Sequence, residues 1–371
     1  MKNHKKIFSA LLAVVFSTIT LATYANAAEE KVLNVYNWVD YIGADTIAGF
    51  EKETGIKVNY TTYEDNETLD AVLRSKKANY DVVVPSTDWS KSQIEDGLLM
   101  RLDKAKIPNF KNLDTSFLDK IKEGDPNNAY LAGYLWGYTT IGVNVEKVLK
   151  LLGSTPIPKN LWELVFNPTY AKKLQSCGII YLDSASDIMP IALSYAGKPA
   201  YSENAADYAA TLEMLKKIRP FVKEFTSDGQ AEKLADNSTC VALGWGGDFY
   251  RARKISKKAG KLVNIAPVFP ESGGLLFFDN MAIPANAKHS DNAHKFVNYI
   301  LRPQVHASIT KDTQYANPNA ASEKFIDVVM RNDRALMLTK SDFNRLTPPK
   351  ALSEKIRTLR TDIFEQFKAA K

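Results

Sequence analysis

The sequence predicts an α/β fold made of two successive α/β regions. Strand-like apolar runs alternate with amphipathic helical segments from residue 32 to about residue 301, and this alternation is typical of parallel sheets with helices on their faces. The chain has 371 residues, of which 45% are hydrophobic and 24% are charged. This is a globular composition, and the length suffices for two domains, so disorder is excluded.

The first region has the order strand, helix, strand, helix, strand. We predict strands at residues 32–38, 56–63 and 80–84. Asp45 can cap the first helix and Asn66 can cap the second. This order predicts a parallel sheet, and ligands bind such sheets at the carboxyl ends of the strands. We therefore expect functional residues at 37–41 and 85–89.

The second region continues the alternation of strands and helices. Its predicted strands lie at residues 139–145, 178–182, 240–245 and 275–283. Its predicted helices lie at residues 187–195, 205–218 and 291–301, and Pro303 ends the last of them. The tail from about residue 321 is charged, and we predict that it is mostly helical.

The N-terminus has the pattern of a secretory signal peptide. Lys2, Lys5 and Lys6 precede an apolar run at residues 7–21, and Ala-Asn-Ala follows at 25–27. The alternative is a membrane anchor, but a run of about 15 residues is short for a spanning helix. We predict that residues 1–27 are a signal peptide, cleaved after Ala27, and that the mature protein is exported to the periplasm.

Charge balance and motif content argue against several function classes. Lys and Arg number 48 against 42 Asp and Glu, with no long basic run, so no nucleic-acid partner is expected. The motifs GxSxG, GxxxxGK[ST] and HExxH are absent from the sequence, so no nucleophile elbow, phosphate loop or zinc protease site is indicated. We expect His289, His294 and His306 to be surface residues. The protein is expected to be no enzyme and to need no cofactor or metal.

The sequence contains two cysteines, Cys177 and Cys240. In an exported chain such a pair favours one disulfide, because the compartment is oxidising. The alternative is two separate buried thiols. No CxxC motif is present, so neither a thiol redox site nor a zinc site is predicted.

An aromatic residue lies close to an aspartate in four segments near predicted strand ends. The segments are NWVDY at 37–41, STDW at 86–89, GWGGD at 244–248 and FFD at 277–279. They suit an organic cation with an apolar body, since rings can pack around its methylene groups while carboxylates pair with its amines. Aliphatic amines have pKa values of about 10 and arrive charged. Singly, each segment is better explained as a core ring beside a turn-forming Asp, but four together favour the ligand.

Six segments carry a resemblance to a known family. They are LNVYNW at 33–38, FEKETGIKV at 50–58, YDVVVPS at 80–86, GWGGD at 244–248, FFD at 277–279 and YAN at 315–317. The chain resembles the periplasmic polyamine-binding proteins of ABC importers, most closely their putrescine-binding members, over nearly all of its length after residue 27. The resemblance implies two α/β lobes in the type II arrangement, each a mostly parallel sheet flanked by helices, with a hinge between them.

The same resemblance implies the function and the division of the chain. The lobes would close over putrescine or spermidine without catalysis, and a periplasmic monomer would deliver the ligand to a permease in the inner membrane. Lobe 1 would comprise residues 28–136 and 274–314, and lobe 2 would comprise residues 137–273 and 315–371. The cysteine pair matches the disulfide of the family.

The resemblance also implies a set of ligand-binding residues. The methylene chain would be surrounded by Trp38, Tyr41, Trp245, Phe277 and Tyr315. The main carboxylates would be Asp40, Asp248 and Asp279, with Asp248 and Asp279 leading, and Ser86 would offer an oxygen atom.

Four positions depart from the pattern of the putrescine-binding members. Val39 stands where the family often has Ser or Thr, and Asp187 stands where it has Glu. Because Asp is shorter by one methylene group, Asp187 would reach the amine through water. Asp88 and Trp89 stand where the family has Ser and Phe. Asp88 would either favour a longer polyamine with a third amine, or cap the following helix and face solvent.

Three other functions are weighed against polyamine binding. The ligand could be another cation such as agmatine. It could be a ferric ion, which needs clustered Tyr with His or carboxylate ligands, and the aromatic and acidic pattern fits this poorly. The protein could also be a periplasmic hydrolase with an unrecognised carboxylate pair.

Overall fold

The computed structural model describes residues 29–77, 79–268, 270, 272–333, 336, 338, 341 and 344–370. The predicted signal peptide, residues 1–27, lies outside the described residues. None of the helices in the described part of the chain is long and apolar enough to cross a membrane.

The first sheet is parallel and has the strand order β2-β1-β3. Its strands are β1 (Val32–Trp38), β2 (Lys57–Tyr63) and β3 (Val82–Val83). The helices that follow them are α1 (Thr46–Thr54), α2 (Asn66–Ser75) and α3 (Thr87–Glu95). The predicted strand–helix alternation of this region is confirmed. Helix α3 was anticipated only in the alternative in which Asp88 caps a following helix.

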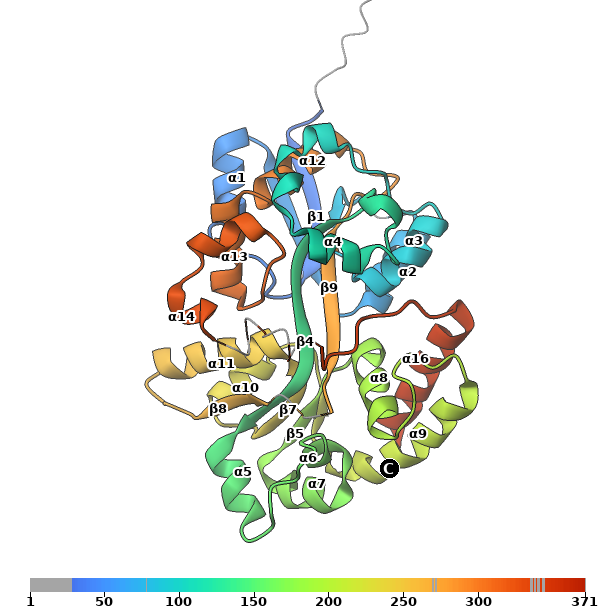
Figure 1. Ribbon diagram of the computed structural model, residues 1–371, viewed down its shortest axis with the longest axis vertical. Coiled ribbons are helices and arrows are strands. Elements are labelled where there is room, and N and C mark those ends of the chain that lie inside the picture. Colours follow the sequence, from blue (N-terminus) through green and yellow to red (C-terminus); the bar gives the residue numbers. More distant parts are fainter. Residues whose placement is uncertain are drawn as a thin grey trace, which may run out of the picture.

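Two antiparallel strands connect the two halves of the molecule. β4 (Ala132–Asn144) pairs through its first part with β9 (Leu275–Met281) and through its last part with β7 (Val241–Trp245) and β8 (Ile265–Val268). In Figure 1, β4 and β9 run side by side from the upper half of the molecule into the lower half. They form a covalent and hydrogen-bonded link between the lobes.

The second sheet has the order β6-β5-β7-β4-β8, with β9 beside β4. β5 (Ile179–Tyr181) is parallel to β7, as expected for a mostly parallel sheet, and also to β6 (Glu224–Phe225), a strand that was not predicted. β4, in contrast, is antiparallel to β7, β8 and β9. This sheet is therefore mixed rather than mostly parallel. The reason is that β4 arrives from the other lobe along β9, whereas crossover helices set the common direction of β5 and β7.

Helices cover both sheets and fill the space around them. Around the second sheet lie α5 (Val145–Leu152), α6 (Glu163–Phe166), α7 (Pro168–Leu174), α8 (Ala185–Tyr195), α9 (Ala205–Ile218), α10 (Gln230–Ala235), α11 (Gly246–Lys258) and α16 (Glu354–Ala369). The others are α4 (Thr115–Ile121), α12 (Ser290–Ile300), α13 (Pro303–Thr313) and α14 (Val328–Arg331). Short 3₁₀ turns lie at Lys104–Lys106, Pro108–Asn112, Pro126–Asn128, Gln175–Cys177, Arg219–Phe221 and Ala320–Phe325.

Each half has its own hydrophobic core. One core joins β1 to α12 and includes Phe50 and Phe296. The other joins β5 and β7 to α8, α9 and the C-terminal α16, whose Phe364 and Phe367 are buried. Since an independent core is what defines a domain, the chain folds as two α/β lobes.

The tail is helical only in part. α16 is a long helix, but residues 348–353 form none. α16 packs on α8 and α9, while the 3₁₀ turn Ala320–Phe325 packs on α13, on the side of the first sheet. Residue 315 as the start of the lobe 2 tail, like the other lobe boundaries, stays a prediction.

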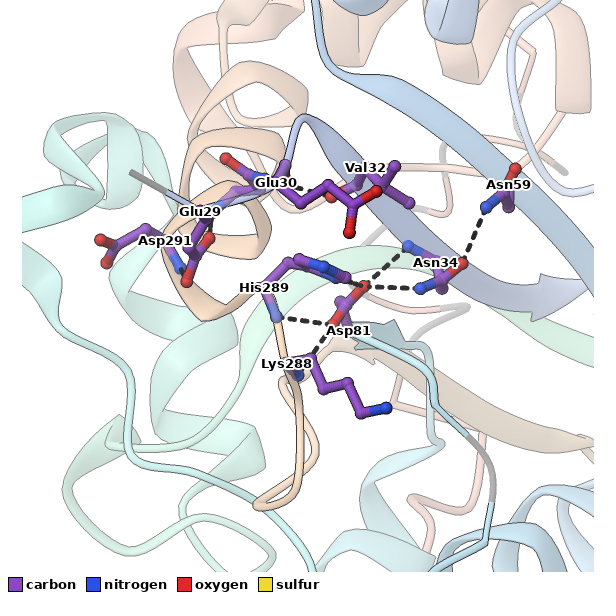
Figure 2. A network of polar contacts seen from close by, with 10 residues as sticks. Glu29, Glu30, Val32, Asn34, Asn59, Asp81, Lys288, His289 and Asp291 are labelled. Atoms are coloured by element: carbon purple, nitrogen blue, oxygen red, sulfur yellow. Dashed lines mark hydrogen bonds and ion pairs between the residues drawn. The ribbon is translucent and has the colours of Figure 1, made fainter. Parts of the chain in front are cut away.

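A buried aspartate fixes the base of the first lobe (Figure 2). Asp81 precedes β3 and accepts hydrogen bonds from the backbone N–H of Asn34 and His289 and from the His289 ring nitrogen. Glu29 accepts from two backbone N–H groups in the first turn of α12. These contacts tie β1 and the residue before β3 to α12 and the segment that precedes it.

The expectation of surface histidines is wrong for two of the three. His294 is 3% exposed and His306 is fully buried. The His294 Nε2 atom accepts a hydrogen bond from the Asp103 N–H, and the His306 ring contacts the Tyr134 carbonyl. Burial lowers the pKa of His306 to about 4. Both rings are therefore packing elements of the first lobe.

Cys177 and Cys240 form a disulfide in the second lobe, with their Cα atoms 5.5 Å apart. The disulfide joins the turn before β5 to the residue before β7. The predicted pairing is confirmed.

Candidate ligand-binding site

A cavity of about 70 Å³ lies where the two lobes face each other. All eleven residues expected to bind a ligand line it, and they come from both lobes and from the segment after α13. They are Trp38, Asp40, Tyr41, Ser86, Asp88, Asp187, Trp245, Asp248, Phe277, Asp279 and Tyr315. The predicted strand ends, residues 37–41 and 85–89, are thus brought to one place, as expected for a parallel sheet.

Asp279, on β9, is a buried carboxylate of the site. It is 4% exposed and accepts hydrogen bonds from the Tyr41 hydroxyl (2.8 Å) and the Ser86 hydroxyl (2.6 Å). Burial raises its pKa to about 7, and the nearby carboxylates of Asp187 and Asp88 raise it further while the two hydroxyls lower it. No basic side chain of the described residues pairs with Asp279.

Asn66 holds the Ser86 hydroxyl in place. Its amide nitrogen donates to the Ser86 Oγ atom at 3.0 Å, and its Oδ1 accepts from the Ser86 backbone N–H. The prediction that Asn66 caps α2 is wrong, because Asp65 is the cap and accepts from the Thr68 N–H. Asn66 is therefore free to support Ser86, a role that sequence reasoning missed.

Asp187 lies in the first turn of α8 and is held by three donors. The Thr139 hydroxyl (3.0 Å) and the Trp245 indole N–H (3.1 Å) donate to one carboxylate oxygen, and the Ser184 hydroxyl (2.7 Å) donates to the other. Burial raises its pKa. Because the indole is tethered, Asp187 also fixes the ring plane of Trp245.

Aromatic rings form the apolar part of the cavity wall. Trp38 and Trp245 meet edge to face, with ring centroids 6.1 Å apart. Tyr315 packs against Tyr41 at 5.0 Å and against Phe277 at 6.0 Å. These rings leave faces and edges toward a methylene chain or an ammonium group.

The glycine pair of the GWGGD segment has a steric role. A Cβ atom on Gly247 would lie 2.5 Å from the ring of Tyr315. A side chain at this position would therefore push Tyr315 out of place. The glycine allows α11 to approach the ring, and this places Asp248, in the first turn of the same helix, in the cavity wall.

Asp248 and Asp40 share a basic side chain that was not foreseen. The Arg251 Nη2 atom lies 3.0 Å from an Asp40 carboxylate oxygen, and its Nε lies 3.9 Å from the nearest Asp248 oxygen. Burial raises the pKa of Asp248 to about 6, against the lowering effects of Arg251 and a hydrogen bond with Tyr315. Asp40 is half exposed and already ion-paired, so its charge is less available to a ligand than expected.

Asp88 lies in the first turn of α3, and Ser86 is the residue at the N-cap position. Asp88 is partly buried and lines the cavity rather than projecting into solvent. Burial raises its pKa to about 6, while Arg360 and Arg357 lower it. Trp89 is not in the wall, contrary to expectation. It is 4% exposed, and the guanidinium groups of Arg357 and Arg360 lie over its ring.

The remaining wall residues were not anticipated. Apart from Val39, which lies in the expected segment 37–41, they are Tyr63, Glu64, Asn66, Thr139, Ser186, Tyr201, Ser227, Asp228, Gly229, Gln230, Arg251, Leu275, Leu276 and Pro349. Glu64 could have been found, because it directly follows a strand of the parallel sheet. With Glu64 and Asp228, seven carboxyl side chains line the cavity against one basic side chain, Arg251. The wall therefore favours a cationic guest.

Two α/β lobes joined by a pair of long strands, with a ring-lined acidic cavity between them, are the architecture of a solute-binding protein. The chain belongs to the family of bacterial extracellular solute-binding proteins, whose family profile matches residues 45–337.

Similar proteins of known name cover almost the whole chain. The putrescine-binding periplasmic protein PotF of Escherichia coli is 38% identical over 369 residues, which are 99% of each chain. The putrescine-binding periplasmic protein SpuD of Pseudomonas aeruginosa is 38% identical over 367 residues, 99% of this chain and 100% of the relative. These relatives are named as periplasmic binding proteins.

Solved structures agree with the fold. A spermidine/putrescine ABC transporter protein from Listeria monocytogenes has a TM-score of 0.83 and 30% identity, covering 92% of this chain and 100% of its own. The spermidine/putrescine substrate-binding protein PotD of Streptococcus pneumoniae has a TM-score of 0.71 and 25% identity, covering 91% of this chain and 99% of its own. The two-lobe type II fold is confirmed.

Proposed function

We propose that this chain is the periplasmic polyamine-binding component of an ABC importer, which captures putrescine or spermidine between its lobes and delivers it to the permease. The names of the relatives at 38% identity support this proposal. The signal-like N-terminus supports export to the periplasm, where the mature chain acts as a monomer without catalysis.

The observation that carries the proposal is Asp279. A carboxylate buried among Tyr41, Ser86 and two further carboxylates, without a basic partner in the described residues, is costly when ionised. An incoming ammonium group removes that cost by pairing with it. The binding energy thus comes from pairing of the ammonium group with a buried carboxylate.

The rest of the wall suits the apolar body of such a ligand. Trp38, Trp245 and Tyr315 offer ring faces and edges to methylene groups and to ammonium charge. The cavity of about 70 Å³ has room for about five water-sized groups at roughly 10–15 Å³ each.

A thermal-shift panel tests the function. Putrescine, cadaverine, spermidine, spermine, agmatine and ferric ion are each added to the purified, dialysed protein. A ligand that binds only the folded state raises its melting temperature, so we expect a shift with putrescine or spermidine and none with ferric ion. A shift with ferric ion alone, or none with any amine, would refute polyamine binding. Turnover of a polyamine amide would instead support the hydrolase.

A further inference from the structure

A buried guanidinium group lies behind the cavity wall. Arg360, on the C-terminal helix α16, is 1% exposed. Its Nη2 atom is 3.2 Å from a carboxylate oxygen of Glu67, on α2 of the other lobe, and its guanidinium carbon lies 5.6 Å from the centre of the Trp89 ring. Its Nε atom is buried without a hydrogen-bond partner. Burying a charged guanidinium group costs free energy, so a specific role for Arg360 is expected.

Arg360 lies next to the cavity wall, because its partner Glu67 accepts a hydrogen bond from Ser186, a wall residue, and Trp89, whose ring lies beneath it, directly follows Asp88. It lowers the pKa of Glu67, Asp88 and Asp187, and it is the basic group with the largest effect on Asp88. Asp88 and Asp187 line the cavity, whereas Arg360 does not. The guanidinium therefore lies on the protein side of the wall and faces the same carboxylates that a bound cation would face from the other side.

The neighbouring carboxylate, Asp279, has no such partner. Asp88 and Asp187 raise its pKa, and all three carboxylates line the same cavity. Arg360 lowers the pKa of two of these three carboxylates, Asp88 and Asp187. Asp279 therefore needs an ammonium group of the ligand as its partner. The charges of Asp88 and Asp187, in contrast, are already partly offset by Arg360.

We propose that Arg360 is a specificity-determining residue: its guanidinium group takes the place of a third ligand ammonium beside Asp88 and Glu67, so that the cleft prefers a diamine to a triamine. This inference rests on the proposed polyamine-binding function. It reverses the selectivity that Asp88 suggests when the sequence alone is considered.

The physical argument is a difference between two ligands. Both a diamine and a triamine can place one ammonium against Asp279. The additional ammonium of spermidine would be dehydrated beside Asp88, where the buried positive charge of Arg360 already offsets part of the carboxylate charge and repels a second cation. This loss of binding free energy affects spermidine and not putrescine, so the internal charge of Arg360 makes the cleft select between the two ligands.

Calorimetry with putrescine and spermidine tests the inference. Wild type should bind putrescine more tightly than spermidine. In Arg360→Met the ratio of spermidine affinity to putrescine affinity should rise by at least about tenfold, because Asp88 then lacks its internal partner. Arg219→Met is the matched control: Arg219 also lies over an aromatic ring and contacts α16, but it is not in the cavity wall. Its ratio should not change.

The outcomes separate the inference from the function on which it rests. If wild type binds neither amine, the proposed function fails. If wild type binds amines but prefers spermidine, or if the ratio in Arg360→Met equals that of wild type, the role of Arg360 is overturned while the function stands. Arg360→Gln, which keeps a hydrogen-bond donor toward Glu67, replaces the Met variant if circular dichroism shows that the latter does not fold. The same rise in ratio is expected.

Discussion

The Tyr41 hydroxyl donates a hydrogen bond of 2.8 Å to Asp279, although the two residues are 238 positions apart in the sequence. Tyr41 follows β1, and Asp279 lies on the strand that links the lobes. The bond joins the carboxyl end of the first sheet to the connection between the lobes. The central carboxylate of the cavity is therefore placed by the part of the molecule where the two lobes meet.

Replacing Asp279 should nearly abolish polyamine binding. Loss of one partner of a buried charge pair costs about 3–5 kcal/mol, so Asp279→Ala should weaken binding by roughly two to three orders of magnitude, and Asp279→Asn somewhat less. Calorimetry measures the change. Asp119→Asn, in an exposed ion pair with Lys122, is the control and should bind like wild type. A loss of less than about fivefold in both Asp279 variants would place the ammonium site elsewhere.

The hydroxyl groups that hold Asp279 should matter to a smaller degree. Tyr41→Phe removes one donor to the carboxylate and keeps the ring. Hydrogen bonds to charged groups contribute about 1.5–3 kcal/mol, so affinity for putrescine should fall by roughly ten- to a hundredfold. The double variant with Ser86→Ala should fall further. Unchanged calorimetric affinity in Tyr41→Phe would mean that Asp279 needs no support from this ring.

Ligand affinity should decrease with acidification. The ligand-free pKa of Asp279 is about 7, and an ammonium group pairs only with the ionised carboxylate. Putrescine affinity should therefore fall as the pH drops through about 7, with protons released on binding below that value. Calorimetry in two buffers of different ionisation enthalpy measures the protons. Affinity that rises on acidification would contradict the assignment.

The stability of the ligand-free protein should change in the opposite direction. Asp279 has a folded pKa of about 7 against an ordinary value of 3.8. The folded state thus binds more protons between these values, and its contribution to stability is fully present below about 3.8 and is lost as the pH rises through about 7. The melting temperature of wild type relative to Asp279→Asn should therefore decline from acid to neutral pH. If the difference in melting temperature between wild type and Asp279→Asn stayed constant over this pH range, burial would not raise the pKa of Asp279.

The disulfide should stabilise the second lobe. The bond closes a segment with a sequence separation of 63, and chain entropy assigns such a loop about 4 kcal/mol. Cys177→Ser combined with Cys240→Ser should lower the free energy of unfolding by up to that amount in a urea titration. Two free thiols in freshly purified periplasmic protein, detected by mass spectrometry, would contradict the pairing.

The sequence predicts those parts of the site that depend on local order. Residues 37–41 and 85–89 follow strands whose apolar pattern is clear, and strands of a parallel sheet end at the same edge, so Tyr41 and Ser86 could be placed together. The direction of β4 could not be predicted, because it depends on pairing with β9, which is more than 130 residues away.

The internal cations could not be predicted for the same physical reason. Arg251 reaches Asp40 only because α11 packs across the cleft from β1, and Arg360 reaches Glu67 only because the C-terminal helix returns to the lobe interface. Neither approach leaves a periodic signal in the sequence. The acidic residues were therefore predicted as unpaired ligands, although several of them have partners within the chain.

The most direct test of the central claim is a crystal structure with bound putrescine. We predict one ammonium nitrogen at about 2.7–2.9 Å from a carboxylate oxygen of Asp279, with the methylene chain packed against the rings of Trp38 and Trp245. An amine bound only to Asp40 or outside the cavity, with Asp279 free of contact, would contradict the role of Asp279 as the partner of the ammonium group.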